Sequence, residues 1–217
     1  MKKVIIAGAS GLIGSELLSL LLGNKNITEV VTLVRKPLNL THNKLVQIPV
    51  NFDSLDSYKS DIQGDVFYCC LGTTKYKTPD LRDYRKVDFD YPLALAQMAA
   101  QNDISQFHFV SAMGANVNST VFYTKLKGDI EYALKQLTIQ SLHIYQPALL
   151  TGKRLEERKN EKMAVAIMKI VDPLLIGPLA KYKSIPAATV AMAMQNQTFK
   201  NMMGVHTYTS DIIKKLA

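Results

Sequence analysis

Val4-Ile5-Ile6-Ala7-Gly8-Ala9-Ser10-Gly11-Leu12-Ile13-Gly14 is the stretch that decides the fold, and it lies near the start of the chain. Four apolar residues precede the first glycine, and leucines recur from Leu12 to Leu22. A continuous apolar run predicts a buried strand, and the recurring leucines predict a helix with an apolar face. The stretch therefore predicts a strand, a tight glycine turn and a helix in direct succession.

The rest of the chain repeats this alternation of strands and helices. Short apolar, β-branched runs predict further strands over residues 30–34, 45–50, 66–71, 107–110 and 142–145, with helices over 80–102 and 122–135 between some of them. Strands that alternate with helices indicate a parallel sheet covered on both faces. We therefore expect an α/β fold of the Rossmann type, a doubly wound parallel sheet flanked by helices.

The length of 217 residues fits one well-filled domain. We expect a core over about residues 1–150. After Pro147 the pattern changes, because the helices predicted over 163–171 and 187–195 are separated by prolines and a glycine. Residues from about 151 to 217 are therefore predicted to form a small C-terminal part on the substrate side of the same domain.

The composition is that of a globular protein, with 47% hydrophobic and 20% charged residues. No apolar run approaches the roughly 20 residues of a membrane-spanning helix, so we expect no membrane insertion. The two cysteines, Cys69 and Cys70, are adjacent and cannot bridge distant parts of the chain. The lysines at the start lead into a strand and not into a signal peptide. These features together predict a cytoplasmic location.

The formal net charge of +8 is concentrated toward the C-terminus. Residues 1–150 contain 15 basic and 13 acidic side chains, whereas residues 151–217 contain 11 and 5. Much of the excess lies in the segment 152–162, which mixes both signs. We interpret this segment as a solvated loop leading into a helix, against the alternative of a polyanion-binding patch, so no nucleic-acid partner is expected.

The spacing of the three glycines indicates a bound dinucleotide. Gly8 permits a tight turn, Gly11 leaves room for a pyrophosphate, and Gly14 lets the helix pack closely on the strand. The free amides at the start of the helix then attract the anion. Glycines in any strand-to-helix turn can produce this spacing, but here the buried strand and the amphipathic helix supply the required setting. The predicted cofactor-binding turn comprises Gly8, Ser10, Gly11, Leu12, Ile13 and Gly14.

The end of the second predicted strand distinguishes two cofactors. An acidic residue at this position favours NAD, because it binds the ribose, whereas arginine accommodates the 2′-phosphate of NADP. This chain has Arg35 followed by Lys36, and Ser10 in the turn would assist them. The motif favours NADP(H) over NAD. The alternative is that Arg35 is merely a surface residue after a strand.

Two further strand ends are candidates for cofactor contacts. Asp53 follows the third strand, where it would either lie near the adenine amino group or cap the next short helix. The segment Leu71-Gly72-Thr73-Thr74 follows the fourth strand and would let the backbone lie against the cofactor riboses. A plain turn is the alternative for this segment.

Ser111, Tyr123 and Lys127 form the candidate catalytic set. Ser111 ends the fifth strand, and a spacing of four puts Tyr123 and Lys127 on one face of the next helix. A tyrosine hydroxyl has a pKa of about 10 and needs a nearby cation to act as a base at neutral pH. Lys127 would supply that cation and hold the nicotinamide ribose, while Ser111 would donate to the substrate oxygen. A Tyr–Lys pair at this spacing is expected by chance, so the inference depends on its position after the fifth strand.

No metal site is predicted. His42, His108, His143 and His206 are scattered along the sequence, which favours core or surface positions over metal ligation. Cys69 and Cys70 alternate faces in a buried strand, which favours packing over nucleophilic chemistry.

Together these motifs resemble the short-chain dehydrogenase/reductase superfamily, specifically its atypical branch. The segments 70–75, 123–131 and 146–150 look like the Tat-interacting-protein type of oxidoreductase and its bacterial relatives. The resemblance implies a core that binds NADP(H), with Pro147 near the nicotinamide and residues 184–186 beginning a segment on the substrate side. Gln146 and Ala148 depart from it, since relatives often have arginine and glycine there.

The leading hypothesis is an NADP(H)-dependent oxidoreductase that acts on a carbonyl or alcohol group of a small molecule. One alternative is a regulatory or redox-sensing protein that binds NADPH with little turnover. Another is a nucleotide-sugar epimerase with tightly held NAD, against which Arg35 and the short C-terminal part both argue. This fold often pairs through its long fourth and fifth helices, so a homodimer is one assembly open to the chain, but the sequence does not specify the oligomeric state. The sequence does not specify the substrate.

Overall fold

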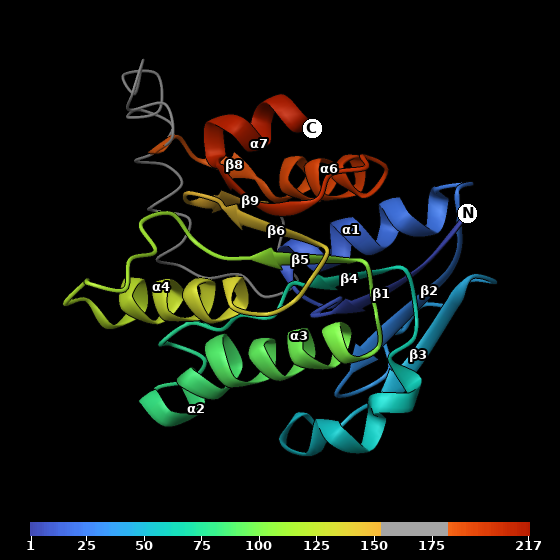
Figure 1. Ribbon diagram of the computed structural model, residues 1–217, viewed down its shortest axis with the longest axis horizontal. Coiled ribbons are helices and arrows are strands. Elements are labelled where there is room, and N and C mark those ends of the chain that lie inside the picture. The colour runs from blue at the N-terminus through green and yellow to red at the C-terminus, as the bar shows by residue number, and fades with distance from the viewer. Residues whose placement is uncertain (153–181) are drawn as a thin grey trace.

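Parallel strands form the central sheet of the computed structural model, which describes residues 1–152 and 182–217 (Figure 1). The strand order of this seven-stranded sheet is β3-β2-β1-β4-β5-β6-β9. Its strands are β1 (Lys2–Ala7), β2 (Ile27–Val34), β3 (Leu45–Pro49), β4 (Val66–Cys69), β5 (Gln106–Val110), β6 (Ser141–Gln146) and β9 (Gly204–Thr209). The short strands β7 (Leu150–Thr151) and β8 (Ile185–Pro186) pair with each other.

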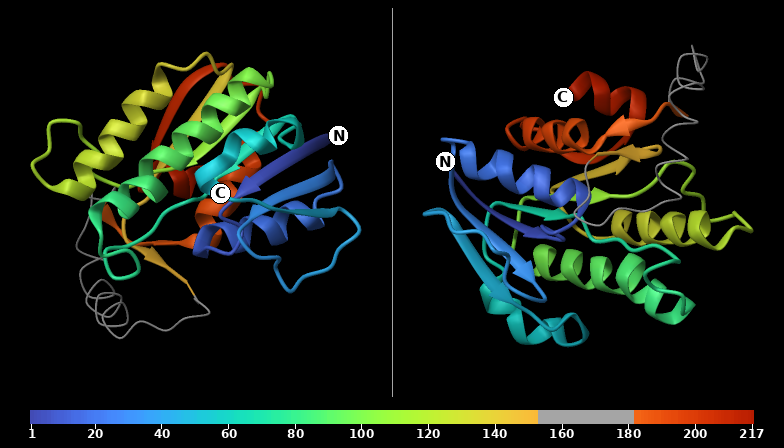
Figure 2. Two further views of the ribbon diagram at one scale, coloured as in Figure 1. Left: turned by 90° about the horizontal axis from the view of Figure 1, so that it is seen from below. Right: turned by 180° about the vertical axis from the view of Figure 1, so that it is seen from behind.

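Helices cover both faces of the sheet, as two further views show (Figure 2). One face carries α1 (Leu12–Gly23), α6 (Ala187–Thr198) and α7 (Ser210–Leu216). The other face carries the 3-10 helix η1 (Phe52–Asp61), α3 (Tyr91–Gln101) and α4 (Phe122–Lys135). A short helix, α2 (Leu81–Arg85), and a π-helical turn, η2 (Lys86–Asp90), lead directly into α3. The Rossmann-like fold predicted from the sequence is confirmed.

Alternating side chains of β1 join the sheet to both helical layers. Val4 and Ile6 are fully buried and belong to the cluster that contains Leu17 of α1. Ile5 is equally buried but belongs to the opposite cluster, which contains Leu95 of α3. Burying one such side chain stabilises the fold by about 1.5–3 kcal/mol. The central strand therefore fixes both layers, and with them the turn that follows it.

Two elements differ from the sequence-based expectation. The helix expected over residues 80–102 is divided by the π-helical turn at 86–90, which widens the helix locally. No strand was predicted over residues 204–209, yet β9 pairs in parallel with β6 at the edge of the main sheet. The partly buried His206 and the exposed Thr207 separate its apolar side chains, so the segment lacks the continuous apolar run that marks the other strands. The helix predicted over residues 163–171 lies outside the described residues.

Candidate functional site

The predicted site residues gather at one edge of the sheet. Gly8 follows β1, Arg35 follows β2, Thr73 lies shortly after β4, and Ser111 follows β5. Ligands of open parallel sheets bind beyond the carboxyl ends of the strands, because the crevices between the helical layers open there. The structure therefore brings the cofactor candidates and the catalytic candidates to the same edge.

The glycine turn is too tight for side chains at two of its positions. Gly8 has a φ of +87°, and a Cβ at this residue would lie 2.6 Å from the carbonyl oxygen of Cys70. A Cβ at Gly14 would lie only 2.1 Å from the carbonyl oxygen of Gly8. The Gly11 amide donates to that same carbonyl oxygen at 2.9 Å. The first helical turn is thereby held directly against the end of β1.

The start of α1 is suited to an anion. Gly11 is its N-cap residue and supplies no side-chain hydrogen bond, and the first turn contains no acidic residue. Leu12 and the buried Ile13 add no polar side chain of their own, so amides are the polar groups available here. In the neighbouring loop, the Oγ1 of Thr74 is buried and has no hydrogen-bond partner among the described residues. These features fit a dinucleotide phosphate and its ribose.

Arg35 and Lys36 are exposed directly after β2. Close by, Asp53 accepts a hydrogen bond from the Tyr91 hydroxyl at 2.8 Å and pairs with Lys86 at 3.2 Å. These two donors lower the pKa of Asp53. Burial and the bond to Asp53 raise the pKa of Tyr91 to about 12, while the charge of Arg35 acts in the opposite direction. Arg35, Asp53 and Tyr91 therefore share one electrostatic environment.

The alternative that Asp53 caps the next helix is wrong. The side chain of Asn51 accepts the hydrogen bond from the Asp53 amide at 3.0 Å and is the N-cap of η1. The carboxylate of Asp53 remains free of the helix and faces Tyr91 and Lys86.

Tyr123 and Lys127 lie one turn apart at the start of α4, as their spacing predicted. Tyr123 is 40% exposed, whereas the Lys127 side chain is 4% exposed. The Lys127 ammonium lies 2.8 Å from Asp88 Oδ1 and 5.3 Å from the centre of the Phe109 ring on β5. Burial lowers the pKa of Lys127, but Asp88 and Tyr123 raise it by more. The net shift of the Lys127 pKa is therefore upward, and the ammonium stays charged.

Asp88 is a site residue that sequence reasoning missed. It lies in the π-helical turn, and its side chain is 1% exposed. Its second oxygen accepts a hydrogen bond from the Thr73 amide at 2.8 Å. Asp88 is one of several acidic residues in the segment 80–90, and only the packing of η2 against α4 distinguishes it from the others.

Ser111 is engaged with a second buried carboxylate. Its hydroxyl donates to Glu131 Oε1 at 2.5 Å, and Gln146 donates to both oxygens of the same carboxylate, at 2.9 and 3.0 Å. To donate to a substrate, the Ser111 hydroxyl would have to rotate away from Glu131. Glu131 was also missed, although its position four residues after Lys127 places it on the same face of α4.

The remaining residues singled out in the sequence lie at the end of β6, in β8 and at the end of β4. Pro147 follows β6, and its carbonyl accepts the Met113 amide at 2.9 Å. Ile185 lies in β8 and is fully buried. Cys69 is buried, and burial raises the pKa of its thiol to about 12, which agrees with a packing role. Cys70 belongs to the opposite core cluster, as the alternation predicted.

Three histidines that are scattered in sequence are brought side by side. His108 on β5, His143 on β6 and His206 on β9 occupy the same register, with ring centres 4.4 and 5.3 Å apart. Their common neighbours are tyrosines: the Tyr145 hydroxyl lies 3.0 Å from His108 Nδ1 and the Tyr208 hydroxyl 3.0 Å from His143 Nδ1. In the described parts of the chain, no group of three or more metal-ligating side chains is placed to hold an ion.

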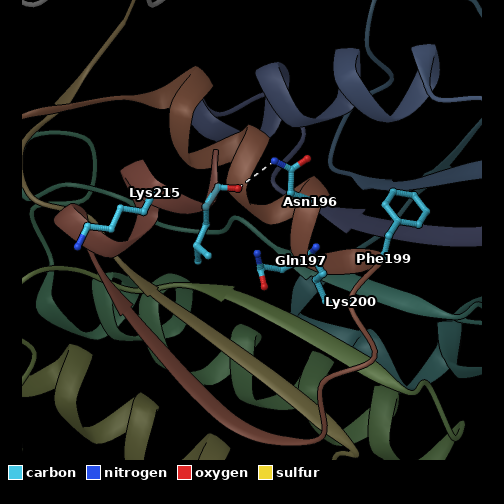
Figure 3. Close-up of a pocket in the computed structure, with 6 residues that line it drawn as sticks. Asn196, Gln197, Phe199, Lys200 and Lys215 are labelled. Atoms are coloured by element: carbon cyan, nitrogen blue, oxygen red, sulfur yellow. Dashed lines mark hydrogen bonds between the residues drawn. The ribbon is translucent and has the colours of Figure 1, made fainter.

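A separate hollow of about 400 Å³ lies between the last turns of α6 and α7 (Figure 3). The Asn196 side chain donates to the Leu216 carbonyl at 2.9 Å there, and Lys200 and Lys215 are among the residues that line the hollow. Because α6 leads to the start of β9 and α7 returns from its end, both helices finish near the amino ends of the strands. The hollow is therefore at the opposite edge of the sheet from the candidate site.

A membrane span is not found among residues 1–152 and 182–217, since none of their helices has the length and apolarity to cross a bilayer.

The fold and the site define an NAD(P)-binding protein of the atypical short-chain dehydrogenase/reductase class. The chain belongs to the NAD dependent epimerase/dehydratase family, whose family model matches residues 4–198. The resemblance inferred from the motifs is thus confirmed.

Curated relatives match most of the chain. It is 34% identical over 199 residues to Protein HTATIP2 of Rattus norvegicus, covering 90% of this chain and 80% of the relative. It is also 34% identical over 165 residues to Protein FMP52, mitochondrial, of Eremothecium gossypii, covering 75% and 73%.

Solved structures share the fold at low identity. The Bordetella bronchiseptica enzyme WbmH, solved in complex with NAD+, superposes with a TM-score of 0.72 at 17% identity, covering 99% of this chain and 78% of that one. The UDP-N-acetylglucosamine 4-epimerase of Methanobrevibacter ruminantium M1 gives 0.70 at 17% identity, covering 96% and 76%.

Proposed function

We propose that this chain is an NADP(H)-dependent oxidoreductase that transfers hydride between the cofactor and a carbonyl or alcohol group of a small molecule. The observation that carries the proposal is the placement of Tyr123 one helical turn from the buried ammonium of Lys127. This pair lies at the same sheet edge as the glycine turn. A proton-transfer group and a dinucleotide-binding turn are the two parts that such a reaction needs.

The residues that we propose for the cofactor lie along this edge of the sheet. The amides at the start of α1 would hold the pyrophosphate, and Arg35 with Lys36 would receive the 2′-phosphate of the adenosine ribose. Thr74 Oγ1, which has no partner within the described residues, is available to a ribose hydroxyl. Lys127 and Pro147 would line the nicotinamide end.

A bound nicotinamide would supply or accept the hydride at the substrate carbon. Tyr123 would exchange the matching proton with the substrate oxygen, and Ser111 would orient that oxygen after turning from Glu131. In the reducing direction the carbonyl carbon gains the hydride, the oxygen gains the tyrosine proton, and Tyr123 regains a proton from water. Atoms and charge therefore balance with one NADPH consumed for each alcohol formed.

The test is NADPH consumption by the purified chain, followed by absorbance across a panel of aldehydes and ketones. Tyr123→Phe is expected to abolish consumption while NADPH binding, measured by calorimetry, is retained. Tyr132→Phe is the matched control, because Tyr132 is 62% exposed on the same helix. Undiminished turnover by Tyr123→Phe would rule out the assigned role.

The same experiment separates the alternatives. NADPH binding without consumption of any carbonyl would favour a regulatory protein that uses the cofactor as a signal. A second candidate, a nucleotide-sugar epimerase, is favoured by the family model and by relatives of the fold that act on UDP-sugars. It requires tighter binding of NAD than of NADP, together with interconversion of UDP-sugars without net use of cofactor.

A further inference from the structure

Asp88 and Lys127 form a buried ion pair inside the candidate site. The ammonium and the carboxylate are 2.8 Å apart, and their side chains are 4% and 1% exposed. Removing both charges from water is costly, and the cost is offset only by close contact and by further hydrogen bonds. Asp88 gains one such bond from the Thr73 amide. Through Asp88, the pair therefore connects Lys127 of α4 to Thr73 in the loop after β4.

The backbone at Asp88 is specialised for this contact. Asp88 lies in the π-helical turn between α2 and α3, where one extra residue widens the helix. Such turns occur frequently at functional sites because they redirect a side chain. The side chains of the flanking acidic residues Asp83 and Asp90 are instead 64% and 45% exposed, and they pair with Lys86 and Arg85 respectively.

The groups that face this pair come from several elements. Tyr123 precedes Lys127 on α4, Tyr84 on α2 has its ring edge-on to Tyr123 at 6.5 Å, and Cys69 at the end of β4 interacts electrostatically with both members of the pair. Phe109 on β5 contributes its ring face to the ammonium. In this set of described neighbours, Lys127 is the cation and Asp88 is the anion.

We propose that Asp88 is a positioning residue that compensates the charge of Lys127 and keeps the Tyr123 hydroxyl protonated, so that the site donates a proton to a carbonyl oxygen. An uncompensated lysine beside the tyrosine would instead favour the phenolate, which removes a proton from an alcohol. This inference rests on the proposed function for its chemistry and adds a direction to it: reduction of a carbonyl compound.

The electrostatics of Tyr123 agree with this direction. Burial raises the pKa of Tyr123, Lys127 lowers it, and Asp88 raises it again, so the net shift is upward. The Tyr84 ring packs against Tyr123, and burial together with Asp88 raises the pKa of Tyr84 as well. Both hydroxyls are therefore protonated at neutral pH, before any cofactor is bound.

The test is a titration of Tyr123 in the apoprotein by NMR, with tyrosine labelled with carbon-13 at Cζ. Tyr123→Phe assigns the signal. In Asp88→Asn the Tyr123 pKa is expected to fall by about one unit or more, because an opposite charge at close range shifts a titration by about 1–3 units. In the double variant Asp88→Asn/Lys127→Met both charges are removed, and the pKa is expected to return to within about half a unit of the wild-type value.

Asp90→Asn is the matched control, since it makes the same substitution two residues away at an exposed ion pair. It should leave the Tyr123 titration unchanged. An unchanged Tyr123 titration in Asp88→Asn would overturn the proposal. The proposal would also be overturned if the Tyr123 pKa shifted as far in the double variant as in Asp88→Asn. If Asp88→Asn does not fold, the double variant alone decides: a Tyr123 pKa displaced by more than about one unit from wild type refutes compensation.

This titration needs neither cofactor nor turnover, so its failure is distinct from failure of the proposed function. A second readout applies once a carbonyl substrate is found. The rate of NADPH consumption should stay level from neutral to mildly alkaline pH in wild type. In Asp88→Asn the loss of rate with rising pH should begin at a lower pH, because the Tyr123 hydroxyl loses its proton earlier. A profile identical in the two proteins would contradict the role given to Asp88.

Discussion

Gly14 is the residue at which the turn tolerates least change, because an added Cβ would meet the Gly8 carbonyl oxygen at 2.1 Å. Neither the first turn of α1 nor the end of β1 can move without opening the core between them. Gly14→Ala is therefore expected to destabilise the fold by about 1–3 kcal/mol and to abolish NADPH binding.

Gly23→Ala is the control for this substitution, since nothing lies within 4 Å of the Cβ it would add in the last turn of the same helix. It should raise the free energy of unfolding by up to about 1 kcal/mol and leave binding intact. Urea unfolding and calorimetric titration measure both quantities. Equal stability of the two variants would show that the turn is not tight.

Arg35 is the residue that we propose distinguishes NADP from NAD. A charge-assisted hydrogen bond to phosphate contributes about 1.5–3 kcal/mol, so Arg35→Ser is expected to weaken NADPH binding about ten- to hundredfold. NADH binding should not change, because NADH has no 2′-phosphate. Arg82→Ser is the control, as the Arg82 side chain is 90% exposed and pairs with Asp80. An equal loss of both cofactors would contradict the role of Arg35.

The buried Asp88–Lys127 pair is also expected to affect the free energy of unfolding. Lys127→Met leaves the Asp88 carboxylate uncompensated and is expected to cost about 3–5 kcal/mol. Asp88→Asn/Lys127→Met removes both charges and should recover a large part of that loss in urea unfolding. Additive losses in the double variant would mean that the two side chains do not interact.

The site residues were predictable from the sequence only to the extent that they follow local rules. Gly8 and Gly14 follow from a turn, and Tyr123 with Lys127 follows from helical spacing. Asp88 and Glu131 were missed because their importance comes from partners on other elements, Lys127 and Ser111 respectively. Tertiary packing, and not residue type, selects them from among the other acidic side chains.

At the scale of elements, the histidine row across β5, β6 and β9 makes stability depend on pH. Burial lowers the pKa of His143 to about 4 and that of His108 well below its usual value of 6.5. The unfolded chain therefore binds more protons than the folded one below pH 6.5. Stability is complete above that value and is lost progressively as the pH falls toward 4.

For His143 alone this loss is on the order of 3 kcal/mol, since each pKa unit corresponds to about 1.36 kcal/mol. His143→Gln removes the titrating group and should flatten the decline of the free energy of unfolding between pH 6.5 and 4. Urea unfolding at several pH values measures this decline in the free energy of unfolding. A decline as steep in His143→Gln as in wild type would exclude the histidine as its cause.

Two features at the element scale could not be predicted from sequence periodicity. The π-helical turn at 86–90 leaves no mark in the apolar pattern, because it changes the spacing by one residue only. The strand β9 is specified by its pairing with β6 and by the tyrosine and histidine contacts across the sheet. By contrast, β1 and α1 were predicted correctly because their apolar patterns are continuous.

At the scale of the whole molecule, a cofactor that binds only the folded chain stabilises it by mass action. At about one hundred times the dissociation constant, NADPH is expected to add about 2.7 kcal/mol, or roughly 5 to 10 °C in Tm. Gly14→Ala should show no such rise. Thermal unfolding with and without NADPH measures the effect, and an unchanged Tm in wild type at saturating NADPH would count against binding.

We propose that one sheet edge holds NADP(H) between Arg35 and Tyr123. A crystal structure of the chain with NADPH tests it most directly. We expect the 2′-phosphate at Arg35, the pyrophosphate at the start of α1, and the nicotinamide beside Tyr123 and Lys127. A dinucleotide bound with its phosphate away from Arg35, or with its nicotinamide remote from Tyr123, would contradict it.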